Sequence, residues 1–270
     1  MSLPADLLAD TRSAPPLVVA RAVAGPRFTA IAGALAAGAP PAACGVAYTG
    51  AGESNPAFDT RAATAELERQ WRGWPLAQMV KTFVEQASTA QTVTTQSAAA
   101  GAASLNALLA ARRVAEGAAF GEENGLDLIA ALSAGKRLAI VGGFPYLKSI
   151  RLEAAQSWVL ELEPEDDQLP ASAAPEVVPQ ADVVGITGST LANGTLEGLL
   201  ALCRRDAFVA IIGPTTPLSS VLFDYGADVL CGSLAQDPAQ ALDSVFAGGS
   251  TRRIPGMRQV SLRPASDVQC

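Results

Sequence analysis

Hydrophobic positions in the second half of the chain fall into short apolar runs separated by segments of helical pattern. Five runs predict strands between residues 137 and 232: RLAIVGGF, SWVLELE, ADVVGITG, AFVAIIGP and GADVLCG. The segments between them, and DPAQALDSVFAGG after them, predict helices. Short apolar strands that alternate with helices are typical of a parallel sheet built from βαβ units. We therefore predict an α/β domain with a doubly wound parallel sheet over residues 121–270.

The first half of the chain shows a different pattern. The runs PLVVARAV, FTAIAGAL and ACGVAYT predict three short strands, and GPR predicts a turn between the first two. From about residue 61 to 113 the pattern becomes helical, as in PLAQMVKTFVEQ, where the apolar positions are Leu76, Met79, Val80, Phe83 and Val84. Strands followed by helices predict a smaller α+β domain over residues 1–120. FGEENG around Gly121 predicts the linker.

Charge and hydropathy exclude several classes of protein. The 270 residues carry a net charge of −7, whereas nucleic-acid binders present basic surfaces, so we expect no nucleic-acid partner. The most apolar early run, FTAIAGALAAGAPPAACGVA, is mostly Ala and Gly and is interrupted by Pro40 and Pro41, so it does not predict a membrane span. No basic segment followed by an apolar core opens the sequence. We expect a soluble, cytoplasmic protein with no membrane partner, and a homodimer is left open.

The chain has no histidine, which removes the commonest general base and transition-metal ligand. Catalytic arrangements that combine Ser or Cys with His are therefore excluded within one chain. The four cysteines, at positions 44, 203, 231 and 270, form no CxxC pair, and free thiols are the expected state. A soft-metal site within one chain would have to join three or more of these distant thiols.

Three strand ends carry loops rich in Gly, Pro, Ser and Thr: GGFPYL (142–147), TGSTLANGT (187–195) and GPTTPLS (213–219). Ligands of open parallel sheets bind beyond the carboxyl ends of the strands. Small residues let a ligand approach the backbone, and helix N-termini favour anions. We predict a cleft that binds a small anionic or polar metabolite through Gly142, Gly143, Phe144, Thr187, Gly188, Ser189, Thr190, Asn193, Gly194, Thr195, Gly213, Pro214, Thr215 and Thr216.

A purely structural role competes with this hypothesis. Ser, Thr and Asn also cap helices, while Gly and Pro make turns, so capping explains most single loops of this kind. Three such loops at one edge of a sheet favour a ligand cleft. Two further candidates are Glu53, in the loop TGAGES, and Asn106, in the apolar segment SLNALLA. A surface acid is the favoured interpretation of Glu53, and Asn106 is either a buried hydrogen-bonded group or a cleft residue.

The first loop does not match the dinucleotide fingerprint GxGxxG, because Pro145 stands where the third glycine is required. Glu161 and Glu163 follow Gly142 by about 20 residues, where such folds often carry an acid that binds ribose. These acids lead into the charged run EPEDDQ, and charge runs usually face water. A solvated acidic loop is therefore the favoured interpretation.

The segments VGGFPYL, ADVVGITGSTLANGTLEGLL, IIGPTTPLSSVLFDYGADVLCGS and DPAQAL closely resemble the putative heavy-metal chelation family of uncharacterised Rossmann-like proteins. The match spans about residues 126–262. The stretches RFTAI, GVAYT and AAAGAASLNALLA resemble that family's N-terminal domain, which is similar to the enolase N-terminal fold. The resemblance implies two domains that enclose a cleft lined by the three loops. The family often has an imidazole beside the first glycine, whereas this chain has Gly143.

Three hypotheses follow, in order of preference. The first is a metabolite-binding protein, with enzyme activity left open. The second is heavy-metal chelation or the handling of a metal–organic complex. The third is an interaction protein whose loops only cap helices. We predict that no zinc, copper or nickel is bound stoichiometrically and that any metal enters the cleft with an organic ligand. A hard cation on Glu53, Asp224 or the acidic loop is left open.

Overall fold

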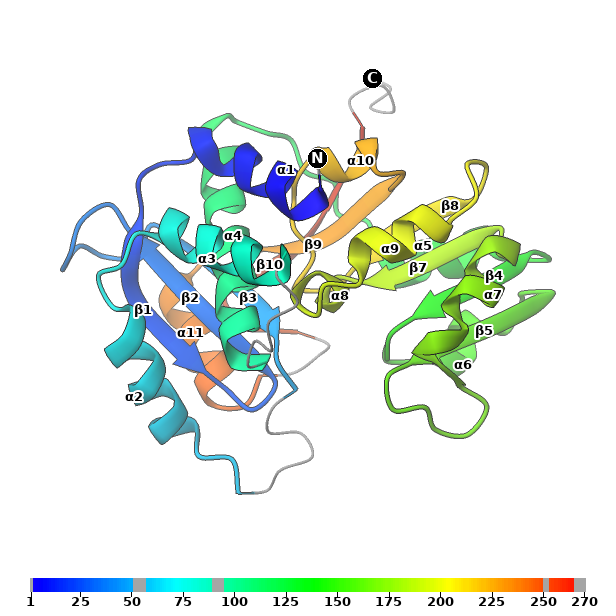
Figure 1. Ribbon diagram of the computed structural model, residues 1–270, viewed down its shortest axis with the longest axis horizontal. Coiled ribbons are helices and arrows are strands. Elements are labelled where there is room, and N and C mark those ends of the chain that lie inside the picture. Colours follow the sequence, from blue (N-terminus) through cyan, green and yellow to red (C-terminus); the bar gives the residue numbers. More distant parts are fainter. Residues whose placement is uncertain (1, 51–56, 89–94, 250–252, 265–270) are drawn as a thin grey trace.

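The computed structural model describes residues 2–50, 57–88, 95–249 and 253–264. Within these ranges the strands form two sheets (Figure 1). The first is antiparallel, with three strands in the order β1-β2-β3. Its strands are β1 (Val18–Ala24), β2 (Phe28–Ala34) and β3 (Ala43–Tyr48).

Four helices accompany the first sheet: α1 (Leu3–Asp10), α2 (Thr60–Trp71), α3 (Leu76–Ser88) and α4 (Thr95–Ala115). The start of α2 is set by Asp59, whose carboxylate accepts hydrogen bonds from the N–H groups of Arg61 and Ala62. Helix α4 packs across β2 and β3 through a face of small side chains. A Cβ atom on Gly45 of β3 would lie 2.0 Å from the carbonyl oxygen of Ala103 in α4, so only glycine permits this approach.

The second sheet has seven strands in the order β10-β9-β8-β7-β4-β5-β6 within the described residues. All neighbours are parallel except β9 and β10. From β6 to β9 this is the Rossmann order 3-2-1-4-5-6, which confirms the predicted doubly wound fold. The strands are β4 (Arg137–Val141), β5 (Gln156–Glu161), β6 (Leu169–Pro170), β7 (Val183–Thr187), β8 (Phe208–Ile212), β9 (Val229–Ala235) and β10 (Met257–Leu262).

Helices cover both faces of the second sheet because its strands are apolar on both sides. In β4, Leu138 and Ile140 pack in one cluster with Ile129 of α5, whereas Ala139 and Val141 belong to the cluster on the other face. The second cluster also holds residues of α7, α9 and α10. The helices of this region are α5 (Gly125–Leu132), α6 (Leu147–Ile150), α7 (Ala174–Val177), α8 (Ser189–Ala192), α9 (Leu196–Leu202) and α10 (Val221–Asp224).

Several of these helices are shorter than the pattern predicted. PYLKSIRLEAA contains only the four residues of α6, which begins after Tyr146 in a left-handed conformation with φ of 66°. APEVVPQA contains α7 and a single 3₁₀ turn, Val178–Gln180, in which Pro179 lacks the N–H that a longer helix would use. The remaining 3₁₀ turns are Thr11–Ser13 and Ala171–Ala173.

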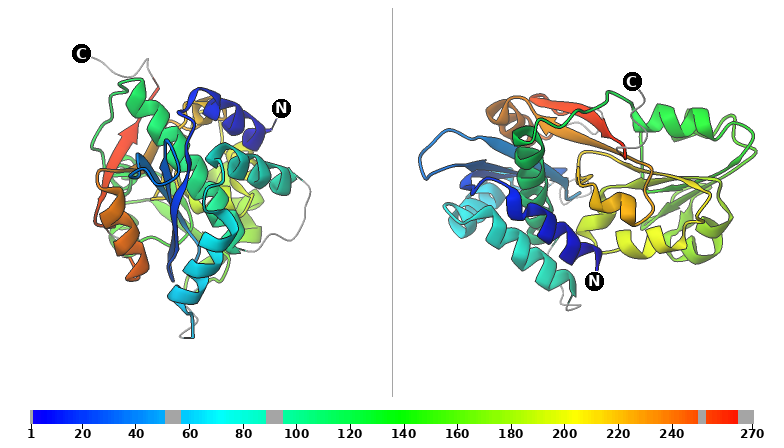
Figure 2. Two further views of the ribbon diagram at one scale, coloured as in Figure 1. Left: turned by 90° about the vertical axis from the view of Figure 1, so that its left-hand side faces the viewer. Right: turned by 90° about the horizontal axis from the view of Figure 1, so that it is seen from above.

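The last part of the chain returns to the first sheet. Helix α11 (Pro238–Phe246) buries Ala241, Leu242 and Val245 in one cluster with Val23 and Phe28 of the antiparallel strands. Figure 2 shows this helix, in orange, beside the blue strands. The antiparallel edge strand β10 and the docking of α11 were absent from the sequence-based scheme. The division near residue 120 stays a prediction, and α11 crosses it.

Polar contacts also join α1 to later parts of the chain. Asp10 pairs with Arg112 of α4 and accepts a hydrogen bond from the Ser219 hydroxyl at 2.6 Å. The Tyr225 hydroxyl donates to Asp6 at 2.7 Å. These contacts hold α1 against the segment that follows β8. None of the helices in the described ranges combines the length and apolarity needed to span a bilayer.

Candidate functional site: a cleft at the switch point of the parallel sheet

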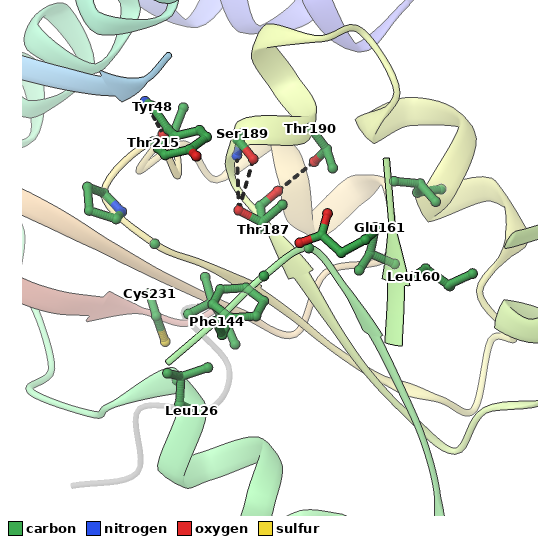
Figure 3. Close-up of a pocket in the computed structure, with 18 of the residues that line it drawn as sticks. Tyr48, Leu126, Phe144, Leu160, Glu161, Thr187, Ser189, Thr190, Thr215 and Cys231 are labelled. Atoms are coloured by element: carbon green, nitrogen blue, oxygen red, sulfur yellow. Dashed lines mark hydrogen bonds between the residues drawn. The ribbon is translucent and has the colours of Figure 1, made fainter. Parts of the chain in front are cut away.

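A cleft of about 1500 Å³ opens at the carboxyl ends of β4, β7 and β8 (Figure 3). Chain order reverses between β4 and β7, which makes this the topological switch point where Rossmann folds bind ligands. Phe28 and Tyr48 of the antiparallel sheet complete the wall, so both sheets contribute to the cleft. The two rings pack edge to face, with their centroids 5.8 Å apart.

The glycine turn after β4 brings three strands together. Gly142 has φ of 105°, and a Cβ atom there would lie 2.5 Å from Cγ2 of Thr187. A Cβ atom on Gly143 would lie 2.6 Å from Oε1 of Glu161 at the end of β5. Gly142 is therefore required by its positive φ and by its contact with Thr187, whereas a side chain at Gly143 would displace only the flexible end of Glu161. Phe144 extends the turn along the cleft wall toward Leu126 and Cys231 (Figure 3).

The hydroxyl-rich loop after β7 uses part of its polarity for its own structure. The Thr190 hydroxyl donates to the Thr187 carbonyl at 2.6 Å. Asn193 Oδ1 accepts from the N–H and hydroxyl of Thr195, at 3.2 and 2.7 Å. The hydroxyls of Thr187 and Ser189 lie 3.0 Å apart at the cleft wall. Since each hydroxyl has two acceptor sites and one donor, this pair retains capacity for a ligand.

The loop after β8 joins the second sheet to the first. Gly213, with φ of 116°, turns the chain, and its N–H donates to the Cys231 carbonyl. The Thr215 hydroxyl accepts from the Tyr48 N–H at 2.8 Å. A Cβ atom on Gly188 would lie 2.4 Å from the Thr216 nitrogen, so this glycine lets the second and third loops pack together.

The structure brings twelve of the predicted ligand-binding residues to the cleft wall: Gly142, Gly143, Phe144, Thr187, Ser189, Thr190, Asn193, Gly194, Thr195, Gly213, Pro214 and Thr215. Gly188 and Thr216 lie behind that wall, where the loops pack against each other. Glu53 lies outside the described residues.

Asn106 also lies behind the wall, as a buried residue of α4. Its amide donates to the carbonyls of Val46 and Thr215, at 3.1 and 3.0 Å. The sequence left two interpretations open, and in the structure Asn106 is a buried hydrogen-bonded group and not part of the cleft lining.

Glu161 lines the cleft, although the sequence interpretation placed it in a solvated loop. That interpretation is right for the loop beyond it, since residues 162–167 are exposed, and wrong for Glu161, which is half-buried. Its side chain accepts a bond from the Leu162 N–H at 3.2 Å, and no Lys or Arg among the described residues pairs with it. Burial consequently raises the pKa of this carboxyl above its ordinary value. The spacing from Gly142 is the sequence signal that pointed to it.

Comparison with known proteins identifies the family of this chain. A family model named DUF364 and described as "Putative heavy-metal chelation" matches residues 124–263, which hold all three loops. The chain belongs to the DUF364 family. A DUF364 protein of unknown function from Desulfitobacterium hafniense DCB-2 has a similar structure, with a TM-score of 0.74 and 25% identity over 96% of this chain and 97% of the other.

A second DUF364 protein of unknown function, from Pyrococcus horikoshii, shares the fold with a TM-score of 0.69. It is 17% identical and covers 97% of this chain and 98% of the other. No curated protein matches the chain. The DUF364 comparisons thus establish the family and the fold, and the site has to be interpreted from its own chemistry.

The donor groups in the described part of this DUF364 chain do not fit direct chelation of a heavy metal. Soft metals bind thiolates and imidazoles, and the sequence has no histidine. Burial raises the pKa of the Cys44, Cys203 and Cys231 thiols to about 12, so these groups are protonated at neutral pH. Within the described ranges, no three Cys, Asp or Glu side chains are grouped so that they could share a metal ion.

Proposed function

We propose that this DUF364 protein binds a small polar metabolite in the cleft at the switch point. One observation carries the proposal. Three loops from separate parts of the sequence converge on a single concavity, and each presents a glycine at a positive φ, namely Gly142, Gly194 and Gly213. Concave sites of several hundred cubic ångströms with a few convergent polar groups are typical ligand sites.

The charges of the cleft favour an uncharged or cationic ligand over an anion. Its lining includes the carboxylates Glu123, Asp127, Glu161 and Glu163, and no Lys or Arg among the described residues. Glu123 is committed to Arg263, whose guanidinium lies 2.7 Å away and lowers the pKa of that carboxyl. The helices after the glycine turn and the hydroxyl-rich loop are short, with four residues in α6 and seven in α9. A phosphate would therefore find carboxylates and no opposing cation.

The alternative is a metal that enters the cleft with an organic ligand, as the DUF364 description suggests. The donor set of the described residues gives the metal itself no multidentate site. In this alternative the loops contact the organic part of the complex. In both functions the loops bind an organic molecule. The functions differ in whether a metal ion accompanies that molecule.

The hydroxyl pair Thr187 and Ser189 provides the test. The protein is dialysed against an extract of small metabolites, and the molecules enriched with it are identified by mass spectrometry. We expect the wild type to enrich at least one small polar molecule. The double variant Thr187→Val, Ser189→Ala should reduce that enrichment about tenfold, because loss of two neutral hydrogen bonds costs roughly 1–3 kcal/mol.

Ala201→Val is the matched control, since Ala201 is exposed on α9 and does not line the cleft. Its enrichment profile should equal that of the wild type. Absence of any enriched molecule, or equal enrichment by the double variant and the wild type, would refute the proposed role of the loop.

A further inference from the structure

Glu161 is a half-buried carboxylate of the cleft that can accept hydrogen bonds from a ligand. It stands at the carboxyl end of β5, against Gly143 on one side. Figure 3 shows its carboxylate pointing toward Thr187 at the end of β7. Its side chain is half-buried, and the bond from the Leu162 N–H at 3.2 Å leaves most of its acceptor capacity open. A carboxylate that is partly desolvated without a cation needs hydrogen-bond donors from elsewhere.

The topology says which donors suit this position. β5 is the second strand of the Rossmann order and pairs with β4, which borders the switch point. An acid at the end of that strand can accept hydrogen bonds from both hydroxyls of a ribose, because its two oxygens match a vicinal diol. The glycine turn leaves room for the sugar beside Glu161, since Gly142 and Gly143 present no side chain.

The surroundings of Glu161 provide places for the two ends of such a ligand. Pro170 of β6 pairs with Glu161, so Ala171 lies beside it, and Leu162 and Pro175 complete an apolar part of the lining. Apolar groups of this kind can pack against the face of a flat base. On the other side, Thr187 and Ser189 offer hydroxyls to the 5′ end of the sugar.

We infer that the metabolite is a ribonucleoside whose ribose hydroxyls bind Glu161 and whose 5′ end carries no phosphate. This inference rests on the proposed function and specifies its ligand. Pro145 supplies no N–H, and α6 has only four residues, so the first loop lacks the helix N-terminus that holds the diphosphate of a dinucleotide. The acidic, cation-free lining within the described residues likewise excludes a preference for phosphate.

Calorimetric titration of the intact chain with adenosine, guanosine, cytidine and uridine tests this inference. At least one should bind, and its 2′-deoxy form should bind about tenfold more weakly, as expected for loss of a hydrogen bond to a charged group. The 5′-monophosphate should bind no more tightly than the nucleoside. Glu161→Ala should bind the ribo and deoxy forms equally, and Glu161→Gln should show intermediate discrimination.

Glu165→Ala is the control, because Glu165 is an exposed acid in the loop that follows Glu161 and does not line the cleft. This variant should discriminate the two sugars as the wild type does. Equal binding of ribo and deoxy forms by the wild type, or tighter binding of the monophosphate, would overturn the inference. If dialysis enriches another molecule and none of the four nucleosides binds, the ribonucleoside is wrong and the proposed function stands. If dialysis enriches no molecule and no nucleoside binds, both the ribonucleoside inference and the proposed function are wrong.

Discussion

Replacing Gly45 with alanine should destabilise the fold by about 3 kcal/mol or more. The new Cβ atom would lie 2.0 Å from the Ala103 carbonyl oxygen and 2.5 Å from the Ala107 nitrogen. These are backbone atoms of α4, which cannot move aside as a flexible side chain could. Overpacking costs typically 1–3 kcal/mol, and we expect the upper end because the helix must shift as a unit.

The effect is measured by thermal unfolding, where 3 kcal/mol corresponds to a fall in Tm of roughly 6–12 °C for a chain of this size. Gly198→Ala is the matched control, since a Cβ atom on Gly198 of α9 meets nothing within 4 Å. It should raise stability by up to about 1 kcal/mol, because alanine favours helix over glycine. A Gly45→Ala variant that unfolds within 1–2 °C of the wild type, roughly half a kcal/mol, would contradict the packing of α4 on β3.

Replacing Asn106 with alanine should cost roughly 2–5 kcal/mol of stability. The substitution leaves the buried carbonyls of Val46 and Thr215 without the amide that now donates to both, and each unpaired buried group costs about 1–3 kcal/mol. These two bonds join α4 to the first sheet and to the loop after β8. The variant should therefore weaken ligand binding indirectly, because it destabilises the fold around the cleft wall. Asn106 itself does not contact the ligand.

Chemical denaturation of Asn106→Ala and Ser104→Ala, with ligand binding measured alongside, tells whether Asn106 supports the fold or binds the ligand. The Ser104 hydroxyl is also buried on α4, but it donates to the Ala100 carbonyl within the same helix, so its loss should cost less than about 1 kcal/mol. If Asn106→Ala were as stable as the wild type and lost ligand binding, Asn106 would be a ligand-binding residue after all.

The two-residue strand β6 was not predicted. The other five parallel strands were predictable because each appears as a continuous apolar run, and four of them, β4, β7, β8 and β9, are largely buried. RLAIV and VVGIT are continuous apolar runs, unlike the surrounding chain, and both form strands at the predicted positions. The edge strand β10 was missed because MRQVSL mixes exposed and buried positions. Its pairing with β9 depends on a neighbour that local pattern does not reveal.

The docking of α11 could not be predicted from its own pattern. Its apolar face predicts burial but not a partner, and the partner is a sheet formed by residues 18–48, far earlier in the chain. The three loops of the cleft were found because they follow predicted strands, and parallel strands bring their carboxyl ends to one edge.

The role of an individual site residue depends on its neighbours in the folded chain, which the sequence does not show. The sequence does not show what each glycine does: Gly143 faces the cleft, whereas Gly188 lies where two loops pack closely together. Glu161 was set aside because its neighbours in sequence are acidic, although its neighbours in space are Gly143 and Thr187 (Figure 3). Burial is a property of the folded chain, so it could not be assigned to Glu161 before the sheet order was known.

Native mass spectrometry of the purified chain, with Gly143→Val as comparison, tests the central claim most directly. Gly143 is exposed, and an added Cβ atom meets only the flexible end of Glu161, so the variant should fold while valine occupies the space beside Glu161 where the ligand is expected to bind. After incubation with the metabolite extract, we predict wild-type protein with the added mass of one small organic molecule, absent under denaturing conditions and absent from Gly143→Val. Protein without added mass, equal added mass in the variant, or the bare mass of a metal ion would contradict the account.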